Sequence, residues 1–401
     1  MNRILPFALF LLVALAVLGG MHAYLWLRLV RDTLVPDPWR RVASYGLLLA
    51  GLLIPAGMFA GRLSGRHLST FVPLLAFVWL GLAFLLFAAL LTVDAARLLA
   101  WGGSAAADWL RGPRDLPDDP ARRLLVARAV AGGALLVAGG ATAFSIRSAT
   151  GPAEIEAVPV KLARLPAALS GYVIAQVSDL HVGPTIRERE VRRMVEQVNA
   201  LRPDAVAITG DLVDGSVRDL GPIVAELGKL QARQGVYFVT GNHEYYSGAA
   251  EWIAFLGELG VKVLKNERVA LGDGKPGGAT FDLAGTPDWS AGHGPAGPDL
   301  QRALAGRDPD RGLVLLAHQP RDFGPTFRAG VELQLAGHTH GGQIFPWSLA
   351  VRAAFPYVKG LHRHQEAGAT GQVYVSRGTG YWGPPMRLLA PPEITRLILT
   401  S

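Results

Sequence analysis

The stretch Tyr172–His181, YVIAQVSDLH, begins as a mostly apolar run and ends in a carboxylate and an imidazole. A short run of this kind, without regular polar alternation, predicts a strand that is buried on both faces of a sheet. Asp179 and His181 follow directly. The sequence therefore places two potential metal ligands at the carboxyl end of a buried strand.

The same pattern recurs along the rest of the chain. Four further apolar runs end in polar residues: 205–209 before Gly210-Asp211, 236–240 before Gly241-Asn242-His243-Glu244, 313–317 before His318, and 333–336 before Gly337-His338-Thr339-His340. Another strand is predicted at 373–376, and helical spacing of apolar residues appears at 191–198, 219–232 and 249–259. This alternation predicts an α/β domain with a parallel or mixed sheet, and sites in such sheets form at the carboxyl edge of the strands.

The segment GHTH brings two imidazoles close together in sequence. Side chains at i and i+2 point the same way on an extended backbone, so a strand end or a tight loop could aim His338 and His340 at one point. Each motif alone also fits a simpler interpretation: a surface turn for H-x-H, or a hydrogen-bonded core residue for His318. Five such blocks in succession, with glycines beside three of them, favour one shared site.

Together these blocks resemble the calcineurin-like metallophosphoesterases. The matching motifs are D-x-H, G-D-x-x-D (211–214), G-N-H-E, a single histidine and G-H-T-H, and they cover about residues 171–345. The trailing GGQIFPW, residues 376–380 and 392–394 are similar to a membrane-associated bacterial branch, some members of which hydrolyse the pyrophosphate of UDP-diacylglucosamine. The resemblance implies a four-layer αββα sandwich of two mixed sheets and a centre of two divalent metal ions.

The resemblance also implies the ligands of both metals. One metal would be held by Asp179, His181, Asp211 and His340. The other would be held by Asp211, Asn242, His318 and His338, so that Asp211 bridges. Because the chain has no cysteine, only oxygen and imidazole ligands are available, and these suit manganese, iron, zinc or cobalt.

Two metals about 3.5–4 Å apart can activate a hydroxide for in-line attack on phosphorus. His243 is not a ligand in the family, and it would protonate the leaving oxygen or stabilise its charge. The alternative is that His243 only supports a neighbouring ligand. Asp214 is expected to orient a histidine rather than to bind metal.

The first 150 residues predict a membrane region. Residues 4–27, 42–61, 68–93 and 129–146 contain no Asp, Glu, Lys or Arg, and each run approaches or exceeds the ~20 residues that cross a bilayer. Buried core helices are the alternative, and the first run could be a cleaved signal peptide. We predict a four-helix transmembrane region over 1–147, a linker over 148–170 and a metallophosphoesterase domain over 171–401.

The net charge of +7 lies in the membrane half, because residues 1–150 hold 14 basic and 7 acidic side chains while residues 151–401 hold 25 of each. A neutral soluble half gives no reason to expect nucleic acid as a partner. Arginines concentrate in the first and third loops, which predicts that these loops are cytoplasmic and that the catalytic domain faces outward from the cytoplasmic membrane of a bacterium. The pair Arg122-Arg123 resembles a twin-arginine export signal, although paired arginines also mark the cytoplasmic end of a membrane helix.

The predicted function is a membrane-anchored, metal-dependent phosphohydrolase for a phosphoester or pyrophosphate, with lipid-linked and nucleotide-linked substrates among the candidates. Aromatic and apolar residues follow the last ligand motif and could line an entry for an acyl chain or pack in loops: Ile344, Phe345, Trp347, Phe355, Tyr357, Tyr381 and Trp382. The competing hypothesis is a non-catalytic scaffold with a phosphoesterase fold. The sequence does not determine the oligomeric state.

Overall fold

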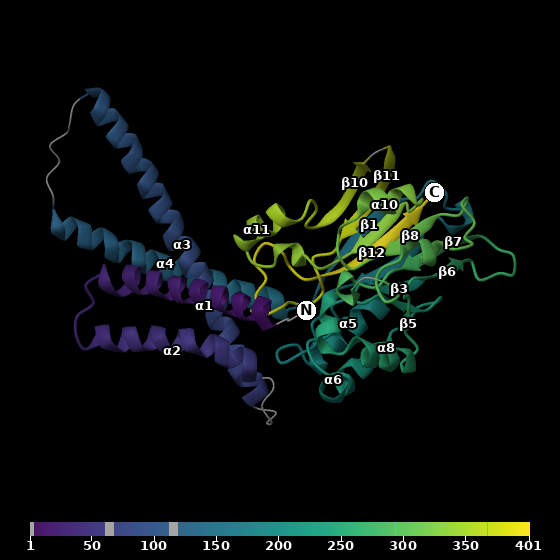
Figure 1. Ribbon diagram of the computed structural model, residues 1–401, viewed down its shortest axis with the longest axis horizontal. Coiled ribbons are helices and arrows are strands. Elements are labelled where there is room, and N and C mark those ends of the chain that lie inside the picture. The colour runs from purple at the N-terminus through teal and green to yellow at the C-terminus, as the bar shows by residue number, and fades with distance from the viewer. Residues whose placement is uncertain (1–3, 61–67, 112–118, 293, 367) are drawn as a thin grey trace. The chain divides into compact units, whose positions relative to one another are not determined.

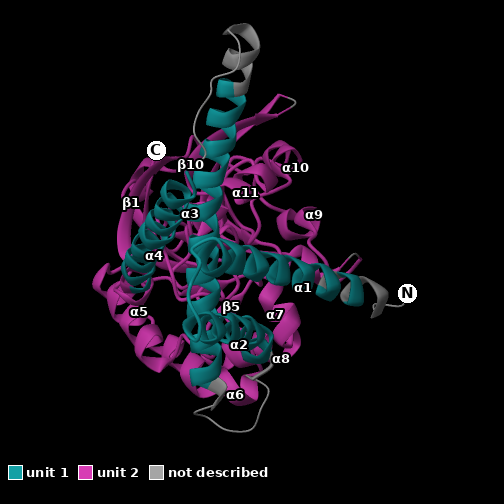
Figure 2. Cartoon of the chain, turned by 90° about the vertical axis from the view of Figure 1, so that its left-hand side faces the viewer, with its two compact units in different colours: residues 1–146 teal, residues 147–401 magenta. Residues whose placement is uncertain are grey.

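The structure is a computed structural model that describes residues 4–60, 68–111, 119–292, 294–366 and 368–401. It consists of two compact units, residues 1–146 and 147–401, which are coloured separately in Figure 2. Each unit is described by itself below.

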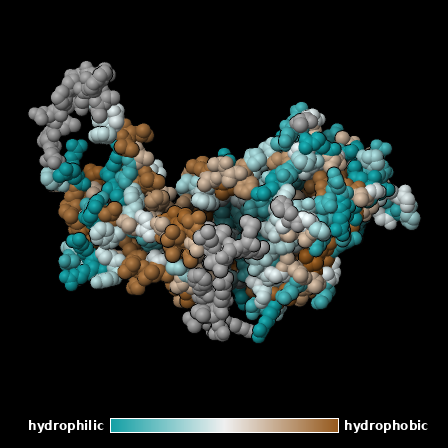
Figure 3. Space-filling view, in the orientation of Figure 1, coloured by the Kyte–Doolittle hydropathy of each residue, from teal (hydrophilic) through white to brown (hydrophobic). Residues whose placement is uncertain are grey.

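The N-terminal unit consists of long helices (Figure 1). They are α1 (Ile4–Trp26), continued by the π-helical turn η1 (Leu27–Arg31), α2 (Trp39–Ala60), α3 (Leu68–Arg111) and α4 (Pro120–Thr150). Four segments are long and apolar enough to cross a membrane: Leu11–Arg31, Trp39–Met58, Thr70–Ser104 and Pro120–Thr150. Many large apolar side chains of these segments are exposed, among them Leu12, Leu49 and Leu136, and brown apolar areas appear between teal and pale ones in Figure 3. The prediction of four candidate membrane-spanning helices is confirmed.

Inside this unit, helix contacts use small residues and paired polar groups. A Cβ added at Gly57 of α2 would lie 2.3 Å from the Cβ of Ala76 of α3, so the two backbones approach closely. The guanidinium of Arg28 lies 2.7 Å from Asp94, which flanks the third charge-free run. Paired charges at the ends of apolar helices avoid the cost of an isolated charge in hydrocarbon.

The C-terminal unit contains two six-stranded mixed sheets. The first has the order β1-β12-β2-β3-β4-β5, formed by Glu154–Lys161, Glu393–Thr400, Tyr172–Val177, Ala205–Ile208, Val236–Phe238 and Lys262–Val263. The second has the order β10-β11-β9-β8-β7-β6, formed by Gly360–Glu366, Ala369–Val375, Leu333–Ala336, Leu313–Leu316, Thr280–Gly285 and Glu267–Gly272. In the first sheet β2 to β5 run parallel, and in the second β7, β8, β9 and β11 do.

Three apolar clusters define the layers. The central cluster joins the facing sides of the two sheets, with Ile174 of β2 and Leu333 of β9 both fully buried in it. A second cluster packs the other side of the first sheet against helices through residues such as Met194 and Trp252. A third covers the outer side of the second sheet through Phe323 and Phe327. These contacts give helices, sheet, sheet and helices in succession, and the predicted mixed α/β class is confirmed.

The helices of this unit are mostly short. They are α5 (Glu188–Ala200), α6 (Val217–Val224), α7 (Asn242–Ser247), α8 (Ala249–Glu258), α9 (Leu300–Leu304), α10 (Phe323–Arg328) and α11 (Trp347–Ala354). The 3-10 turns are η2 (Ala167–Leu169), η3 (Ala225–Lys229), η4 (Trp289–Ala291) and η5 (His340–Gly342). The helix predicted over 219–232 is divided into α6 and η3, followed by an irregular segment.

The prediction that residues 148–170 form a linker is wrong for residues 154–161. They form strand β1, which pairs in parallel with β12. β1 lies at the edge of the sheet and buries only Val158 and Val160, with Pro159 between them. Because an edge strand tolerates proline and leaves most side chains in solvent, the apolar signal that reveals a central strand is absent here.

Candidate metal centre

The polar motifs lie at the carboxyl ends of strands from both sheets. Asp179, Asp211 and Asn242 follow β2, β3 and β4 of the first sheet, while His318 and His338 follow β8 and β9 of the second. Because the two sheets pack face to face, their strand ends bring these loops together. The site is therefore built across two sheets, which agrees with the sandwich of two mixed sheets that the resemblance implies.

Asp179, His181 and His340 form one group of potential ligands. The Nε2 atoms of His181 and His340 lie 3.1 Å apart, and His340 Nε2 lies 3.5 Å from Asp179 Oδ1. Asp179 is fully buried, and His181 is 3% exposed. Two imidazole nitrogens that face each other beside a buried carboxylate present lone pairs to a common point, which suits a cation.

Asp211 connects this group to a second one. Its Oδ2 lies 3.8 Å from His181 Nε2 and 3.1 Å from His318 Nε2, and His318 Nε2 in turn lies 3.2 Å from His338 Nδ1. Asp211, His318 and His338 thus form another group of potential ligands. One carboxylate lies between two sets of imidazoles.

Asn242 and His243 open helix α7 at the same place. The side-chain oxygen of Asn242 is buried without a hydrogen-bond partner among the described residues, and a metal ion would satisfy it. The backbone N–H of His243 donates to Asp211 Oδ1 at 2.9 Å, and His243 Nε2 lies 4.0 Å from Asp211 Oδ2. The structure therefore brings His243 to the same carboxylate that connects the two ligand groups, with Asn242 beside it in the chain.

Asp214 contacts two of these histidines. Its carboxylate lies 2.5 Å from His243 Nδ1 and 3.2 Å from His181 Nδ1. These contacts leave the Nε2 atoms of both rings directed toward Asp211. The expectation that Asp214 orients a histidine agrees with this geometry.

The backbone of the site is held in an uncommon conformation. Asp179, His181, Asp211, His338 and His340 all have positive φ, between 51° and 70°. Non-glycine residues adopt this left-handed region rarely, and they do so mostly where surrounding structure imposes it at functional sites. Of the strand end and the tight loop that the sequence left open for His338 and His340, the structure has the tight loop, in which the chain turns sharply within the motif.

Two glycines let the loops approach closely. A Cβ at Gly241 would lie 2.1 Å from Asp211 Oδ1, and one at Gly337 would lie 2.0 Å from Ser178 Oγ. Neither position can hold a side chain without moving a neighbouring loop. The glycine residues of the motifs thus serve packing between loops.

Burial and the carboxylates shift the pKa values of the histidines in opposite directions. Burial alone would lower the pKa of His318, but the carboxylate of Asp211 raises it to about 10, and Asp214 likewise raises the pKa of His181 to about 9. Burial, assisted by the charge of His318, lowers the pKa of His338 to about 3. Neutral imidazoles are metal ligands, so the metal-free site holds protons on some of the nitrogens that a cation would take.

Two buried charged residues support the loops, and the sequence analysis assigned a role to neither. Glu244 accepts the backbone N–H groups of Gly241, Asp211 and Leu212. Burial, and next the charge of Asp211, raises the pKa of Glu244 to about 7. Arg387 is fully buried and donates to the backbone carbonyls of several loop residues, among them His340 at 2.8 Å. An arginine far from the motifs leaves no local sequence signal, but the final E of G-N-H-E could have drawn attention to Glu244.

A cavity of about 220 Å³ adjoins the second ligand group. His318 forms part of its wall, together with Asp288, Gln319 and Gln334. Asp288 accepts a hydrogen bond from Gln319 at 2.8 Å, while the buried Oε1 of Gln334 has no partner among the described residues. The cavity therefore offers hydrogen-bond acceptors close to His318.

Comparison with known proteins gives the family. The family model described as calcineurin-like phosphoesterase matches residues 172–342, which contain the motifs up to Gly342. A bovine protein named transmembrane protein with metallophosphoesterase domain is 39% identical over 320 residues, covering 77% of this chain and 68% of that protein. The chain belongs to the calcineurin-like phosphoesterase family. The predicted resemblance is confirmed.

A second sequence relative and a solved structure are also similar to this chain. An uncharacterized metallophosphoesterase of Helicobacter pylori strain J99 is 39% identical over 248 residues, covering 61% of this chain and 64% of that protein. A solved dimetal phosphatase from Danio rerio is 12% identical with a TM-score of 0.33, covering 52% of this chain and 88% of that one. The chain spans about two thirds of the length of the two sequence relatives.

Membership of the family implies a dinuclear metal centre and hydrolysis of phosphoester bonds. The residues present fit such a centre, because carboxylate and imidazole groups converge and the buried side-chain oxygen of Asn242 has no hydrogen-bond partner among the described residues. The names of the relatives and the four apolar helices together indicate a transmembrane protein.

Proposed function

We propose that this chain is a membrane-anchored phosphohydrolase whose C-terminal unit, residues 147–401, cleaves a phosphomonoester, phosphodiester or pyrophosphate bond. The observation that carries the proposal is the position of Asp211, 3.1 Å from His318 Nε2 and 3.8 Å from His181 Nε2. One buried carboxylate between two imidazole groups suits a bridging ligand of two cations.

In this proposal the seven ligands divide as the family resemblance implies. Asp179, His181, Asp211 and His340 would hold one metal, and Asp211, Asn242, His318 and His338 would hold the other. When bound, two divalent cations supply Lewis-acid charge to a phosphoryl group and lower the pKa of a water molecule. Because only two of the seven ligands are carboxylates, the site stays net positive and attracts an anionic phosphate.

His243 is proposed to donate a proton to the leaving oxygen. Asp214, 2.5 Å from Nδ1, fixes the ring so that Nε2 faces the site. A general acid must sit within hydrogen-bond reach of the leaving oxygen, and this orientation leaves Nε2 free to do so. The side chain is partly exposed, so it can meet a substrate that enters from solvent.

The metal, the substrate and the location of the C-terminal unit are proposed as follows. The ligand set suits manganese, iron, zinc or cobalt. The cavity beside His318 is proposed to receive the part of the substrate next to the phosphate, with lipid-linked and nucleotide-linked phosphates as the first compounds to test. We place the domain on the extracytoplasmic face of the cytoplasmic membrane of a bacterium, on the arginine distribution of the loops.

The test compares three histidine variants of the full chain. His318→Ala is expected to lower metal content and hydrolysis of a chromogenic phosphodiester together, because it removes a ligand. His243→Ala should keep the metal content and lose about 10²–10⁴-fold in kcat, the range for a general acid. His362→Ala, on β10 and outside the site, serves as the control and should change neither quantity.

Metal content by mass spectrometry and steady-state kinetics give independent results. Full activity of His318→Ala would refute the assignment of the site. A wild-type chain that binds two metals per molecule and hydrolyses no phosphoester in a broad panel would favour the scaffold hypothesis.

A further inference from the structure

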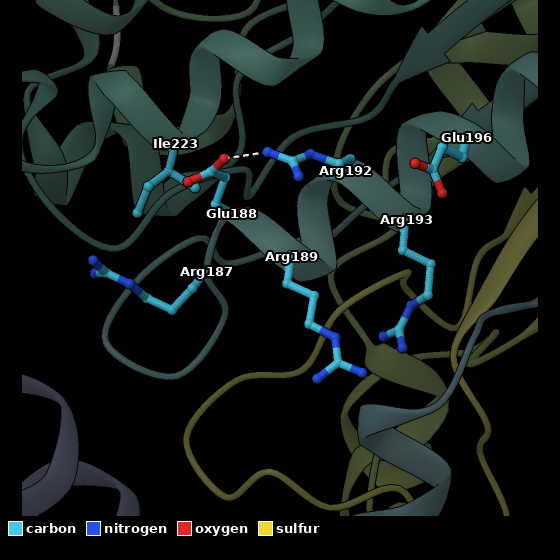
Figure 4. Close-up of a pocket in the computed structure, with 7 residues that line it drawn as sticks. All are labelled: Arg187, Glu188, Arg189, Arg192, Arg193, Glu196 and Ile223. Atoms are coloured by element: carbon cyan, nitrogen blue, oxygen red, sulfur yellow. Dashed lines mark hydrogen bonds and ion pairs between the residues drawn. The ribbon is translucent and has the colours of Figure 1, made fainter.

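The catalytic unit carries an exposed basic face on α5. Four arginines line an open groove of about 640 Å³ there, shown in Figure 4, together with Glu188 and Glu196. Arg192 pairs with Glu188, whereas Arg189 and Arg193 project together from another face of the helix (Figure 4). In the described part of the chain no ion pair joins Arg187, Arg189 or Arg193 to a carboxylate.

This face begins where the chain leaves the last apolar helix. The fourth charge-free run ends at residue 146, and Ala149 packs against Ile186 and Tyr381 in a small buried cluster. At about 1.5 Å per helical residue, Ala149 is about 4.5 Å beyond that run. Ile186 directly precedes Arg187, so the first of the free arginines lies next to the exit from the membrane helix.

A second contact extends this alignment along α5. The backbone N–H of Ala153 donates to Gln197 Oε1 at 3.2 Å, and Gln197 Nε2 donates to the carbonyl of Ala153 at 2.8 Å. The two contacts, at Ile186 and at Gln197, hold both ends of α5 against the segment 149–153. The basic face is thereby fixed beside residues 149–153, which follow the fourth charge-free run.

An apolar rim continues from the same point toward the metal centre. It consists of five exposed side chains on the first turn of α11 and the loops beside it: Phe345, Trp347, Leu349, Trp382 and Leu389. The loops are joined by hydrogen bonds from Gln343 to the backbone of Trp382, in both directions, at 2.8 and 3.0 Å.

One end of the rim, at Trp382, lies near both Ala149 and the metal centre. Tyr381, which packs on Ala149, precedes Trp382, whose ring centroid lies 5.5 Å from that of His243. Scattered exposed apolar residues are ordinary, but several on paired loops beside a site form a patch that marks an interaction surface. Tryptophan is enriched at the boundary between membrane and water.

We propose that α5 and the apolar rim form one docking surface for an anionic lipid bilayer. Arg187, Arg189 and Arg193 contact lipid phosphates, and the rim enters the interfacial layer, so that the mouth of the metal centre faces the membrane. The occupant is identified by charge complementarity and by the position of the helix exit. The inference concerns orientation and does not depend on catalysis.

The expected electrostatic effect is large enough to measure. Each basic side chain near an anionic leaflet contributes about 1 kcal/mol, a factor of about five in the docking equilibrium. Replacing the three free arginines by glutamine should therefore shift that equilibrium by about 100-fold toward the undocked state. Raising the salt concentration should also shift the docking equilibrium toward the undocked state, because salt screens the attraction between arginines and lipid phosphates.

The chain has no cysteine, so single spin labels can be placed cleanly. Full-length protein with Leu389→Cys is labelled and reconstituted in phosphatidylcholine liposomes with or without phosphatidylglycerol. The collision rates of the spin label with oxygen and with a water-soluble nickel chelate report how deeply the label lies in the bilayer. The label is expected at interfacial depth with phosphatidylglycerol, while a label at Lys275→Cys, in the turn between β6 and β7, stays in water.

The charge test uses a triple variant with a matched control. R187Q/R189Q/R193Q should return the label at position 389 to water, whereas K262Q/K265Q/R302Q removes the same number of exposed charges elsewhere and should not. Hydrolysis of a soluble substrate should persist in the triple variant, which separates this inference from the proposed activity.

Three results would overturn the docking surface. One is a label at position 389 that is as accessible to nickel as the label at position 275 in anionic liposomes. Another is depth that is unchanged by lipid charge and by loss of the three arginines. The third is dipolar broadening between labels, which would show that a second copy of the chain covers the face.

Discussion

Gly241→Ala tests how tightly the loops of the metal centre are packed. Gly241 has φ −95° and ψ −171°, which alanine adopts without strain. The only obstacle is space. An added Cβ would lie 2.1 Å from Asp211 Oδ1 and 2.4 Å from the Asp211 backbone nitrogen. Because one of these atoms is backbone, a rotamer change cannot relieve the contact.

The magnitude follows from these distances. Non-bonded atoms separate to about 3.5 Å, so the loop that carries Asn242 and His243 must move by roughly 1 Å. A displacement of that size at a reacting group can cost about 10²-fold in rate. The overpacking should also cost about 1–3 kcal/mol in the free energy of unfolding. We therefore expect kcat to fall about 100-fold and the melting temperature to decrease.

The assay is steady-state hydrolysis of a chromogenic phosphodiester, with metal content and thermal unfolding measured on the same samples. Gly257→Ala is the matched control, because a Cβ at this position of α8 meets nothing within 4 Å. The control should keep full activity and gain up to about 1 kcal/mol from higher helix propensity. Wild-type kcat and metal content in Gly241→Ala would refute the inference that close loop packing positions the site.

Asp214→Asn should lower kcat more than metal content, because it removes the carboxylate that lies 2.5 Å from His243 Nδ1. Asp214→Glu should restore part of the lost kcat. Equal kcat in wild type and Asp214→Asn would contradict the role of Asp214 in orienting His243. The chelator-treated protein should lose thermal stability as pH rises from about 6.5 toward 10. Burial lowers the pKa of His318, but Asp211 raises it by more, to about 10 in the folded protein. The stabilising charge of His318 is therefore fully present only below the histidine's ordinary pKa of about 6.5. Metal-loaded protein should show a weaker trend over the same pH range, and stability that stays level after chelation would argue against the shift. Gly57→Ala should destabilise the helical unit by about 1–3 kcal/mol, because its Cβ would lie 2.3 Å from the Cβ of Ala76 in α3. Thermal unfolding in detergent measures the change. A Cβ at Gly46 meets nothing within 4 Å, so Gly46→Ala should be neutral, and equal melting temperatures of the two variants would contradict the prediction.

Several features were predictable because their causes are local in sequence. A charge-free run needs no partner to indicate a membrane helix, and the four runs correspond to four long apolar helices. Buried central strands such as β2, β3, β8 and β9 are apolar throughout or nearly so, and they were recognised. Edge strand β1 was missed because half-exposed residues carry no such signal. The order of motifs after the strands was sufficient to indicate the family.

The amino-acid sequence alone determined which chemical groups the chain could bring to a site, since the motifs from Asp179 to His340 are readable without any contact. Only the tertiary structure decided that strand ends of two facing sheets supply them, that Asp211 lies between the two imidazole groups, and that Arg387 holds the surrounding loops. The physical reason is that left-handed backbone at the ligand positions, and the close approach of Gly241 to Asp211, are imposed by residues distant in sequence.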